Sequence, residues 1–508
     1  MSRKLRYVYD AEQRRLRDIF GKKIDNSLGY TCKKVAQEIE AMAFRCNKVT
    51  FHPRMSSYKA IDIPSDASLF EELLWRKHRA LQFMLRFLFR HTTAEVLDDL
   101  CTKWPGVQVV EGLRHKIQDV GSDYFRDGTL DLYSFDYRVD RHMVVEVLEV
   151  LIDLLATRSD FEALTAIGYT TSAGFRFQMR TMLSDEEMED IYEDTDFYVE
   201  EGDDFVDDET GKAIYTRETQ PQILKWRPKL WHMPNRQELL SIESFLPGPC
   251  PKARISSSGC EYVGKLHFSA TAVAIDFLER LSPKQRSNLR ELHIQEDRTS
   301  INQPYRHSQG LIPLCQGNPQ LHITQRVDIW QTDLIPNSDS EDWIHHAIWW
   351  SIFRWMQEVK NLHAKGMPDG SFSLVLHGPS ADASQNLADT IIKVAAWQDA
   401  NAEYFRRHQA EFHPYRNGVI SGFPEIVKEV LQGTIPVSLE SEISHEIWDT
   451  AKILREHEGP WPTDFAEAVP EHPFNEPAGG WEAARNEHRI EVDYLERFEG
   501  WDRLLEGE

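Results

Sequence analysis

The chain has 508 residues, of which 41% are hydrophobic and 28% charged, the composition of a globular protein whose core needs no disulfide or metal. Its 58 basic and 82 acidic side chains give a formal charge of −24. Such a surface repels phosphate backbones, so the composition disfavours a nucleic-acid partner.

The cysteines and the N-terminal residues indicate the cellular compartment of the protein. Six cysteines stand at positions 32, 46, 101, 250, 260 and 315, and none form a CxxC pair. Sparse thiols are typical of a reducing compartment, and we expect a cytoplasmic or nuclear protein without a cofactor or metal. The opening MSRKLRYVYD lacks the apolar segment of a signal peptide, and no run of ~18 apolar residues predicts a membrane span.

Residues 1–180 are predicted to form a helical N-terminal region. Apolar residues recur at helical spacing in residues 32–43, 81–88 and 143–156, and a short strand is expected at Val49–Phe51. The helix at 143–156 is apolar around most of its circumference. We therefore expect it to lie deep inside this helical layer.

Two unusual segments follow. Residues 184–210 contain fifteen acidic residues and no Lys or Arg, which predicts a mobile acidic loop, or alternatively an acidic and aromatic docking element. Residues 221–251 contain six prolines and two tryptophans. This spacing predicts an extended segment without helices, because proline interrupts helix interiors.

Residues 211–335 are predicted to form an α/β middle region. A strand is expected at Lys265–Ser269, and a helix on the stripe from Ala274 to Leu281. Apolar residues alternate with polar ones at 291–295 and again at 321–329, the period of half-buried strands. Helices between strands favour crossover connections and parallel pairing. A leucine-rich solenoid is disfavoured because no fixed repeat period is found.

Residues 340–508 are predicted to form a helical C-terminal region with a wrapping tail. A Trp-rich helix at 343–356, a strand at 371–378 and a helix at 382–405 precede shorter pieces. The expected fold class is thus α+β and predominantly helical. It combines a helical N-terminal layer, a small mixed or parallel sheet with helices in the middle, and an irregular helical C-terminal extension.

No complete catalytic or metal motif is found. The GxxxxGK match ending at Lys265 lacks the following Ser or Thr and precedes a strand rather than a helix. The sequence around Ser380 lacks the GxSxG of a nucleophile elbow. His345 and His346 are adjacent on a helix and point about 100° apart, so they cannot share one metal ion. We therefore assign no catalytic residue and no metal ligand.

Six residues remain as candidates for binding a ligand or a partner: Glu296, Asp297, Arg298, His307, Trp349 and Trp350. The first three follow a predicted strand at its carboxyl end, where open α/β sheets place ligands. The favoured interpretation is that Arg298 binds Asp297 or a backbone carbonyl and pins the loop to Gly310. The tryptophans line either an apolar pocket or, as the favoured alternative, a helix in the core.

Two stretches carry a family resemblance. SLGYTCKKVAQEIEAMAFRCNKVTF (27–51) resembles the part after the F-box-like opening of many filamentous-fungal proteins. FSATAVAIDFLERL, EDRTS, GLIPLCQGNP and QRVDIW are similar to a large fungal family of uncharacterised proteins. Those relatives often open with an LPxELRxxIW-type helix, which is not matched here, so Skp1-type docking does not follow. The resemblance implies no activity.

The leading hypothesis is a non-catalytic intracellular protein-interaction protein, adaptor-like in type, that binds a protein partner and neither a membrane nor a nucleic acid. The alternative is an enzyme or small-ligand-binding protein that uses the 296–310 loop or the Trp-rich helix 343–356. The sequence does not identify the partner or the oligomeric state.

Overall fold

A computed structural model provides the coordinates of the chain. It describes residues 6–10, 15–18, 22, 48–54, 65–88, 92–103, 110, 141–157, 159, 161, 168–169, 213–215, 218–246, 261–334, 341–408, 419–442, 446–457 and 489–492. The chain folds into two compact units. Unit 1 comprises residues 1–68, 229–233 and 253–508, and unit 2 comprises residues 69–228 and 234–252.

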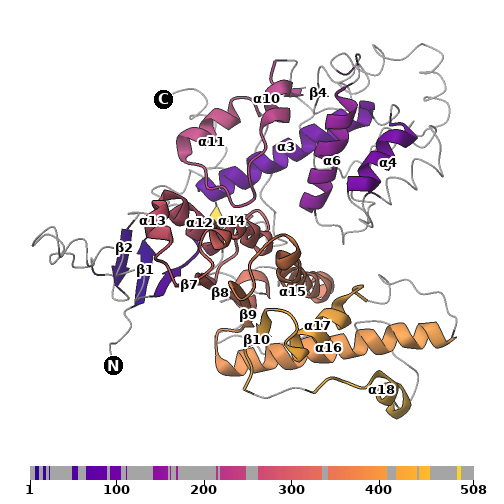
Figure 1. The fold of residues 1–508 in the computed structure, drawn as a ribbon. Helices are drawn as coiled ribbons and strands as arrows, with labels where there is room; N and C mark the ends of the chain where they lie inside the picture. Colours follow the sequence, from indigo (N-terminus) through magenta and orange to yellow (C-terminus); the bar gives the residue numbers. More distant parts are fainter. Residues whose placement is uncertain are drawn as a thin grey trace, which may run out of the picture. The chain divides into compact units, whose positions relative to one another are not determined.

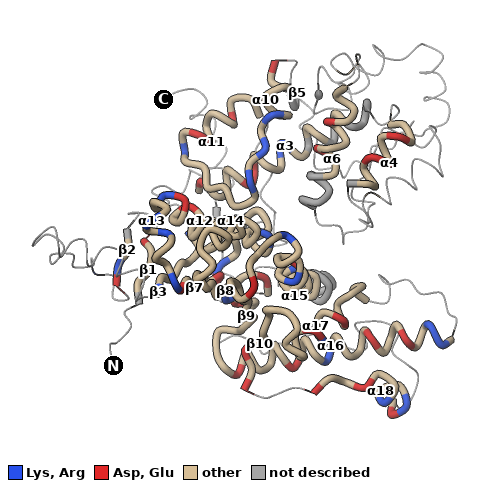
Figure 2. The backbone as a smooth tube through the Cα atoms, in the orientation of Figure 1, with Lys and Arg blue, Asp and Glu red and all other residues tan. Residues whose placement is uncertain are grey.

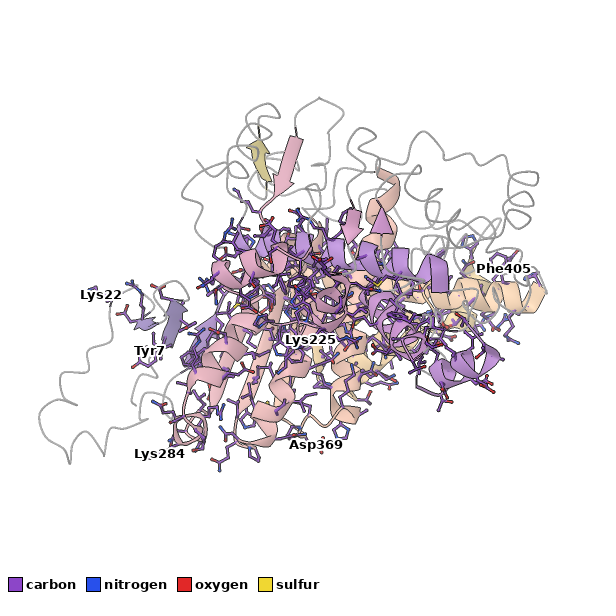
Figure 3. The ribbon with its side chains drawn as sticks, turned by 90° about the horizontal axis from the view of Figure 1, so that it is seen from above. Tyr7, Lys22, Lys225, Lys284, Asp369 and Phe405 are labelled. Atoms are coloured by element: carbon purple, nitrogen blue, oxygen red, sulfur yellow. The ribbon has the colours of Figure 1, made fainter. Side chains whose placement is uncertain are left out.

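Unit 1 contains a seven-stranded sheet in the order β10-β9-β8-β7-β3-β1-β2. Neighbouring strands are parallel except β1 and β2, which are antiparallel. The strands are β1 (Arg6–Asp10), β2 (Arg15–Asp18), β3 (Lys48–Phe51), β7 (Glu291–Glu296), β8 (His322–Asp328), β9 (Phe372–His377) and β10 (Val437–Leu439). In Figure 3, Lys284 and Asp369, which precede β7 and β9, both lie near the lower edge of the view.

The parallel strands follow one another in chain order across the sheet, from β1 to β10. Because crossovers between parallel strands are right-handed, this order favours crossover helices on one face of the sheet. α12 (Ala270–Arg280) accordingly contacts β3 and β7, α15 (Glu341–Ala364) contacts β9 and β10, and α17 (Phe423–Gln432) contacts β10. Figure 1 shows these helices on one side of the sheet.

The face under the helices forms the core of unit 1. Leu292, Ile294, Ile323 and Val327 are at most 1% exposed and belong to one apolar cluster with the helices. The alternation predicted for 291–295 and 321–329 is therefore confirmed, as are the strands near 49–51 and 371–378. The fold is α+β and predominantly helical, as expected.

Several helix predictions are also confirmed. The Trp-rich helix is α15, and the helix expected at 382–405 is α16 (Ala381–His408), which contacts β9. The short pieces of unit 1 are α13 (Pro283–Arg286), η4 (Pro304–Leu311), α14 (Ile312–Gln316), η5 (Trp330–Leu334) and α18 (Thr450–Glu456).

Two predictions are wrong, one in the position of a strand and one in the absence of helices. The strand expected at Lys265–Ser269 is β6 (Glu261–Gly264), which pairs with β11 (Arg489–Val492). His267 and Phe268 form isolated bridges only, because Ser269 caps α12 and the chain turns into that helix at once. The Pro-rich segment at residues 221–251, which was predicted to be extended, contains α10 (Gln220–Lys225) and α11 (Arg236–Glu243). Pro221 lies in the first turn of α10, where proline needs no hydrogen-bond donor.

Unit 2 contains most of α3 (Asp66–Leu88), with α4 (Ala94–Lys103), α6 (Arg141–Leu155), α10, α11 and a small pair of strands, β4 (Gly168–Tyr169) and β5 (Ala213–Tyr215). α3 and α6 confirm the helices predicted at 81–88 and 143–156. Val147, Leu148 and Leu151 of α6 are fully buried, as its composition indicated. The predicted helix at 32–43 and the acidic loop 184–210 lie outside the described residues.

Candidate functional site

The face of the sheet opposite the helices is polar. We call it the polar face, and it is formed by the side chains that alternate with the buried ones along the parallel strands. They are Lys48, Thr50, Glu291, His293, Gln295, His322, Thr324, Arg326, Ser373, Val375 and Ser438, all half-buried or exposed. Parallel sheets usually carry helices on both faces and apolar residues on both. Among the described residues, the polar face is therefore the feature of this fold that most needs a functional explanation.

A row of polar groups crosses the middle of the polar face. The strand register aligns Thr50 with His293, His293 with Thr324, and Thr324 with Ser373. The hydroxyl groups of Ser373 and Thr324 lie 3.5 Å apart. The row thus presents hydroxyl and imidazole groups from four adjacent strands, which can both donate and accept hydrogen bonds.

Ion pairs flank this row on both sides. Lys48 Nζ lies 3.2 Å from Glu291 Oε2, with both side chains about a third exposed. Arg326 Nη2 donates to both carboxylate oxygens of Glu440 at 2.8 Å, and these side chains are 29% and 44% exposed. The charges of the polar face are therefore compensated in pairs while remaining accessible to solvent.

Imidazoles and carboxylates gather at the carboxyl ends of the strands. His52 Nδ1 lies 3.1 Å from Asp297 Oδ2. Gln295 Nε2 donates to Nε2 of His377 at 3.0 Å, and Nδ1 of His377 donates to the carbonyl of Gly378 at 2.7 Å. Strand register alone brings these groups together, because each follows or ends its own strand.

Asp328 ends β8 beside His377. Its Oδ1 accepts hydrogen bonds from the backbone nitrogens of Trp330 at 3.1 Å and Gln331 at 3.3 Å, and so starts the turn into η5. Burial raises the pKa of Asp328, whereas the nearby His377 acts in the opposite direction. Asp328 thus already has a structural role in the chain's own turn.

Glu296, a sequence candidate, lies on the opposite face and is 1% exposed. Its carboxylate accepts from the backbone nitrogens of Ala270 and Thr271, both at 2.9 Å, and from the hydroxyl of Thr271. Burial raises its pKa, and the hydrogen bonds from Thr271 and Ala270 oppose that shift. Gln325 joins the network by donating to Thr271 and accepting from Ser308. Glu296 therefore anchors α12 to the sheet.

His307 is likewise enclosed, at 1% exposure. Its Nε2 donates to the carbonyl of Asn302 at 2.7 Å, so Nδ1 is the acceptor for the hydroxyl of Ser269 at 2.6 Å. The same hydroxyl accepts from the backbone of Ala272 as the N-cap of α12. The Ser269–His307 pair therefore connects η4 to α12 inside the core.

The other candidates have separate surroundings. Arg298 is exposed, and its Nη1 donates to the carbonyl of Asp297 at 3.0 Å and to Gln331 at 3.2 Å. Trp349 is 1% exposed in the core cluster. Trp350 is half-buried, packs edge to face with Phe353 and lies under the guanidinium of Arg354. The structure thus brings Asp297 to the carboxyl edge of the polar face and encloses Glu296, His307 and Trp349.

The polar face itself was missed in the sequence, although its signal was present. The polar members of the alternating runs, such as His293, Thr324 and Arg326, mark the outer side of each strand. What the sequence did not show is that these positions line up on adjacent strands, which depends on strand order. Gln325 gave a false signal, because it is polar but sits at a core position.

The described residues contain no group of three or more His, Cys, Asp or Glu side chains arranged to hold a metal ion. Among the same residues, no helix is long and apolar enough to cross a membrane. Comparisons of the chain with protein-family models, with curated proteins and with solved structures gave no match.

Proposed function

We propose that this protein is a non-catalytic interaction protein, adaptor-like in type, that binds a partner protein with the polar face of its sheet. The observation that carries the proposal is the strand order with its register, which places the described crossover helices on one face and aligns half-buried and exposed polar side chains of the described strands on the other. The row from Thr50 to Ser373 is the proposed centre of the contact.

The dimensions of the polar face suit a protein surface. Six parallel strands at a spacing of ~4.8 Å extend about 24 Å between the outer strands, a broad area suited to a partner surface rather than an enclosed small ligand. In repeat proteins, the extended concave surface formed by the stacked repeats likewise serves to bind partners.

The electrostatics of the polar face favour protein over nucleic acid. Lys48 is paired with Glu291 and Arg326 with Glu440, so the positive charge of each cation is offset by a neighbouring carboxylate. Figure 2 shows Lys and Arg interspersed with Asp and Glu along the described elements rather than gathered in a basic stripe. A nearly neutral, hydrogen-bonding surface matches the polar parts of protein interfaces.

The proposal contains no chemical step because the enclosed candidate side chains are already engaged in hydrogen bonds within the protein. Glu296 and His307 are each hydrogen-bonded within the core. Cys315 is buried, and burial raises the pKa of its thiol to about 12, which keeps it protonated and unreactive. Cys101 and Cys315 are free thiols, in keeping with the proposed cytoplasmic or nuclear location.

The proposal is tested by affinity purification with quantitative mass spectrometry from the source cells, using the full chain and a Thr324→Arg variant. Arginine at this half-buried position in the row projects from the polar face and obstructs a flat partner. We expect the recovery of a specific partner to fall at least about tenfold, as it does for a substitution at an interface hot spot.

The matched control is Thr102→Arg, which adds the same side chain at an exposed position on α4. It is expected to leave partner recovery unchanged. Thermal melts of both variants establish that they fold. Equal recovery of the partner by Thr324→Arg and the unaltered chain would contradict the proposal.

A further inference from the structure

Residues 446–457 contain α18, and we call this segment the strap. α18 contacts α16, and Trp448, which precedes α18, packs against the core cluster of unit 1. Every side chain of the strap is nevertheless exposed or half-buried, and Ile447 is 44% exposed. A segment that buries so little apolar surface gains little free energy from packing, and segments of this kind open locally more readily than the core does.

The polar contacts of the strap converge on Asp399 of α16. Oδ2 of this carboxylate accepts hydrogen bonds from Nε1 of Trp448 at 2.9 Å and from the hydroxyl of Thr450 at 2.6 Å. The same oxygen accepts from Nζ of Lys428 on α17 at 2.7 Å, and that ammonium lies 4.9 Å from the centroid of the Trp448 ring. A carboxylate of α16 and a cation of α17 therefore hold the indole together.

Asp399 is charged near neutral pH. Burial alone would raise its pKa, but the hydrogen bonds from Lys428, Thr450 and Trp448 outweigh burial and hold the pKa below its ordinary value. Hydrogen bonds to an ionised acceptor are stronger than those between neutral groups. The charge of Asp399 is therefore the main attraction between the strap and the two helices.

Release of the strap leaves no charge unpaired in this cluster. When Trp448 and Thr450 withdraw, Asp399 keeps its ion pair with Lys428, and these two side chains are 22% and 30% exposed. The indole nitrogen and the hydroxyl exchange the carboxylate for water, so the net loss is much smaller than the loss from burying an unpaired group. The closed and the open arrangements are therefore both satisfied states of the same two helices.

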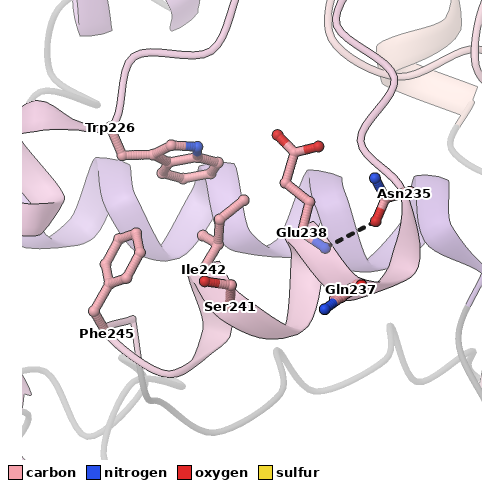
Figure 4. A pocket seen from close by; sticks show the side chains of 7 residues that line it. All are labelled: Trp226, Asn235, Gln237, Glu238, Ser241, Ile242 and Phe245. Atoms are coloured by element: carbon pink, nitrogen blue, oxygen red, sulfur yellow. Dashed lines mark hydrogen bonds between the residues drawn. The ribbon is translucent and has the colours of Figure 1, made fainter.

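Another tryptophan–lysine pair, in unit 2, lacks this property. Nζ of Lys77 lies 5.6 Å from the centroid of the Trp226 ring and donates to the carbonyl of Trp226, but Lys77 is only 3% exposed. Figure 4 shows the Trp226 ring next to Ile242 and Phe245, and the rings of Trp226 and Phe245 meet edge to face at 6.4 Å. Displacing Trp226 would disturb a buried cation, whereas displacing Trp448 would not.

We propose that residues 446–457 are a releasable strap, an intramolecular ligand that covers an indole-binding surface of α16 and α17 centred on Asp399 and Lys428. In the closed state Trp448 occupies this surface. In the open state the surface is exposed while both helices keep their fold. Because the strap is tethered to its own binding surface, its effective concentration there is high, and a weak contact suffices to keep it closed. The device is separate from the polar face.

Limited trypsin digestion of the full chain, followed by mass spectrometry, measures the opening of the strap. Lys452 and Arg455 are exposed on α18, but cleavage after them requires that helix to unwind. Lys393, exposed on α16, reports the unfolding of the core helix in the same digest. We expect cleavage in the strap to be at least about tenfold faster than cleavage after Lys393, and to depend less on urea because opening exposes little surface. Equal rates with equal urea dependence would overturn the proposal.

Asp399→Asn should accelerate cleavage in the strap at least about tenfold and leave both the cleavage after Lys393 and the melting temperature unchanged. Glu403→Gln is the matched control, because it removes the same charge one turn further along α16, where the carboxylate pairs with arginines of the last turn. Equal acceleration in the two variants, no acceleration in Asp399→Asn, or parallel acceleration after Lys393 would each contradict the strap.

The hydroxyl of Thr450 provides an independent test on the strap itself. Thr450→Val keeps the shape of the side chain and removes the donor to Asp399, so it should accelerate cleavage after Lys452 and Arg455 severalfold. Thr450→Ser keeps the hydroxyl and should cleave at the rate of the unaltered chain. If valine and serine at this position gave the same rate, the hydrogen bond to Asp399 would not hold the strap and the proposal would be wrong.

Discussion

Glu296 accepts two hydrogen bonds from Thr271, one from its backbone nitrogen at 2.9 Å and one from its hydroxyl at 2.8 Å. The first turn of α12 is thereby tied to the end of β7. A carboxylate at this position satisfies helix nitrogens that lack partners within their own helix. The pair explains why a fully enclosed acid is found at the edge of an otherwise apolar core.

Replacement of Glu296 by alanine should destabilise the fold by about 2–4 kcal/mol, since the buried donors of Ala270 and Thr271 lose their acceptor. Chemical denaturation monitored by circular dichroism measures this change. Glu291→Ala is the control on the same strand, because its half-exposed ion pair with Lys48 should contribute at most about 1 kcal/mol. Equal losses in the two variants would refute the anchoring role.

Gly310 should not tolerate alanine. A Cβ atom there would lie 2.5 Å from Cε2 of Trp231 and 2.7 Å from Cδ1 of Ile275. We expect Gly310→Ala to cost about 1–3 kcal/mol through overpacking. Gly317→Ala, whose Cβ would meet only backbone oxygens at 3.4 Å or more, should cost less. If the clash is the cause, a Trp231→Ala background will reduce the loss at Gly310 in a double-mutant cycle.

Stability should fall in mild acid because of His267, which is 7% exposed. Burial lowers the pKa of His267, and the hydrogen bond to the carbonyl of Thr299 opposes that shift. Below the ordinary pKa of 6.5 the unfolded chain takes up a proton that the folded chain resists, so the free energy of unfolding decreases as pH falls.

Denaturation midpoints between pH 7 and pH 5 measure this effect, with a contribution of at most about 1.4 kcal/mol per pH unit for one proton. His267→Gln should flatten the profile. His363→Gln, at an exposed side chain paired with Asp369, should leave the slope in place. A slope unaffected by His267→Gln would assign the acid sensitivity to other groups.

Arg298→Ala should change the melting temperature little. The guanidinium is exposed and makes hydrogen bonds to the carbonyl of Asp297 and to Gln331. Interactions of this kind at the surface contribute about 0–1 kcal/mol. Differential scanning calorimetry measures the melting temperature. A large decrease in the Arg298→Ala variant would support the hypothesis that Arg298 pins its loop.

The secondary structure was predictable where periodicity is local. The alternation around Ile294 and Ile323 identified β7 and β8, and the apolar circumference at 143–156 identified α6. The prediction of an extended segment at residues 221–251 was wrong because proline at the start of a helix does not interrupt it. A proline has opposite meanings in the first turn and in the interior of a helix, and composition does not distinguish them.

The site was only partly predictable because it depends on strand order. Asp297 was identified from its place after β7, but its partner His52 comes from a strand 245 positions away in the chain. Glu296, one position earlier, points to the other face because side chains alternate along a strand. Which of the two faces the described helices cover follows from the direction of the crossovers, which no local pattern encodes.

The adjacency of β3 and β7 has a consequence for folding kinetics. All of unit 2 lies in the chain between Phe51, the last residue of β3, and Glu291, the first residue of β7, and these two strands hydrogen-bond to each other. Pairing them closes a long loop, and high contact order slows folding even though the entropy of closure grows only slowly with length. If unit 2 folds first, it shortens that loop. We therefore expect a late, slow refolding phase in which unit 1 completes its sheet.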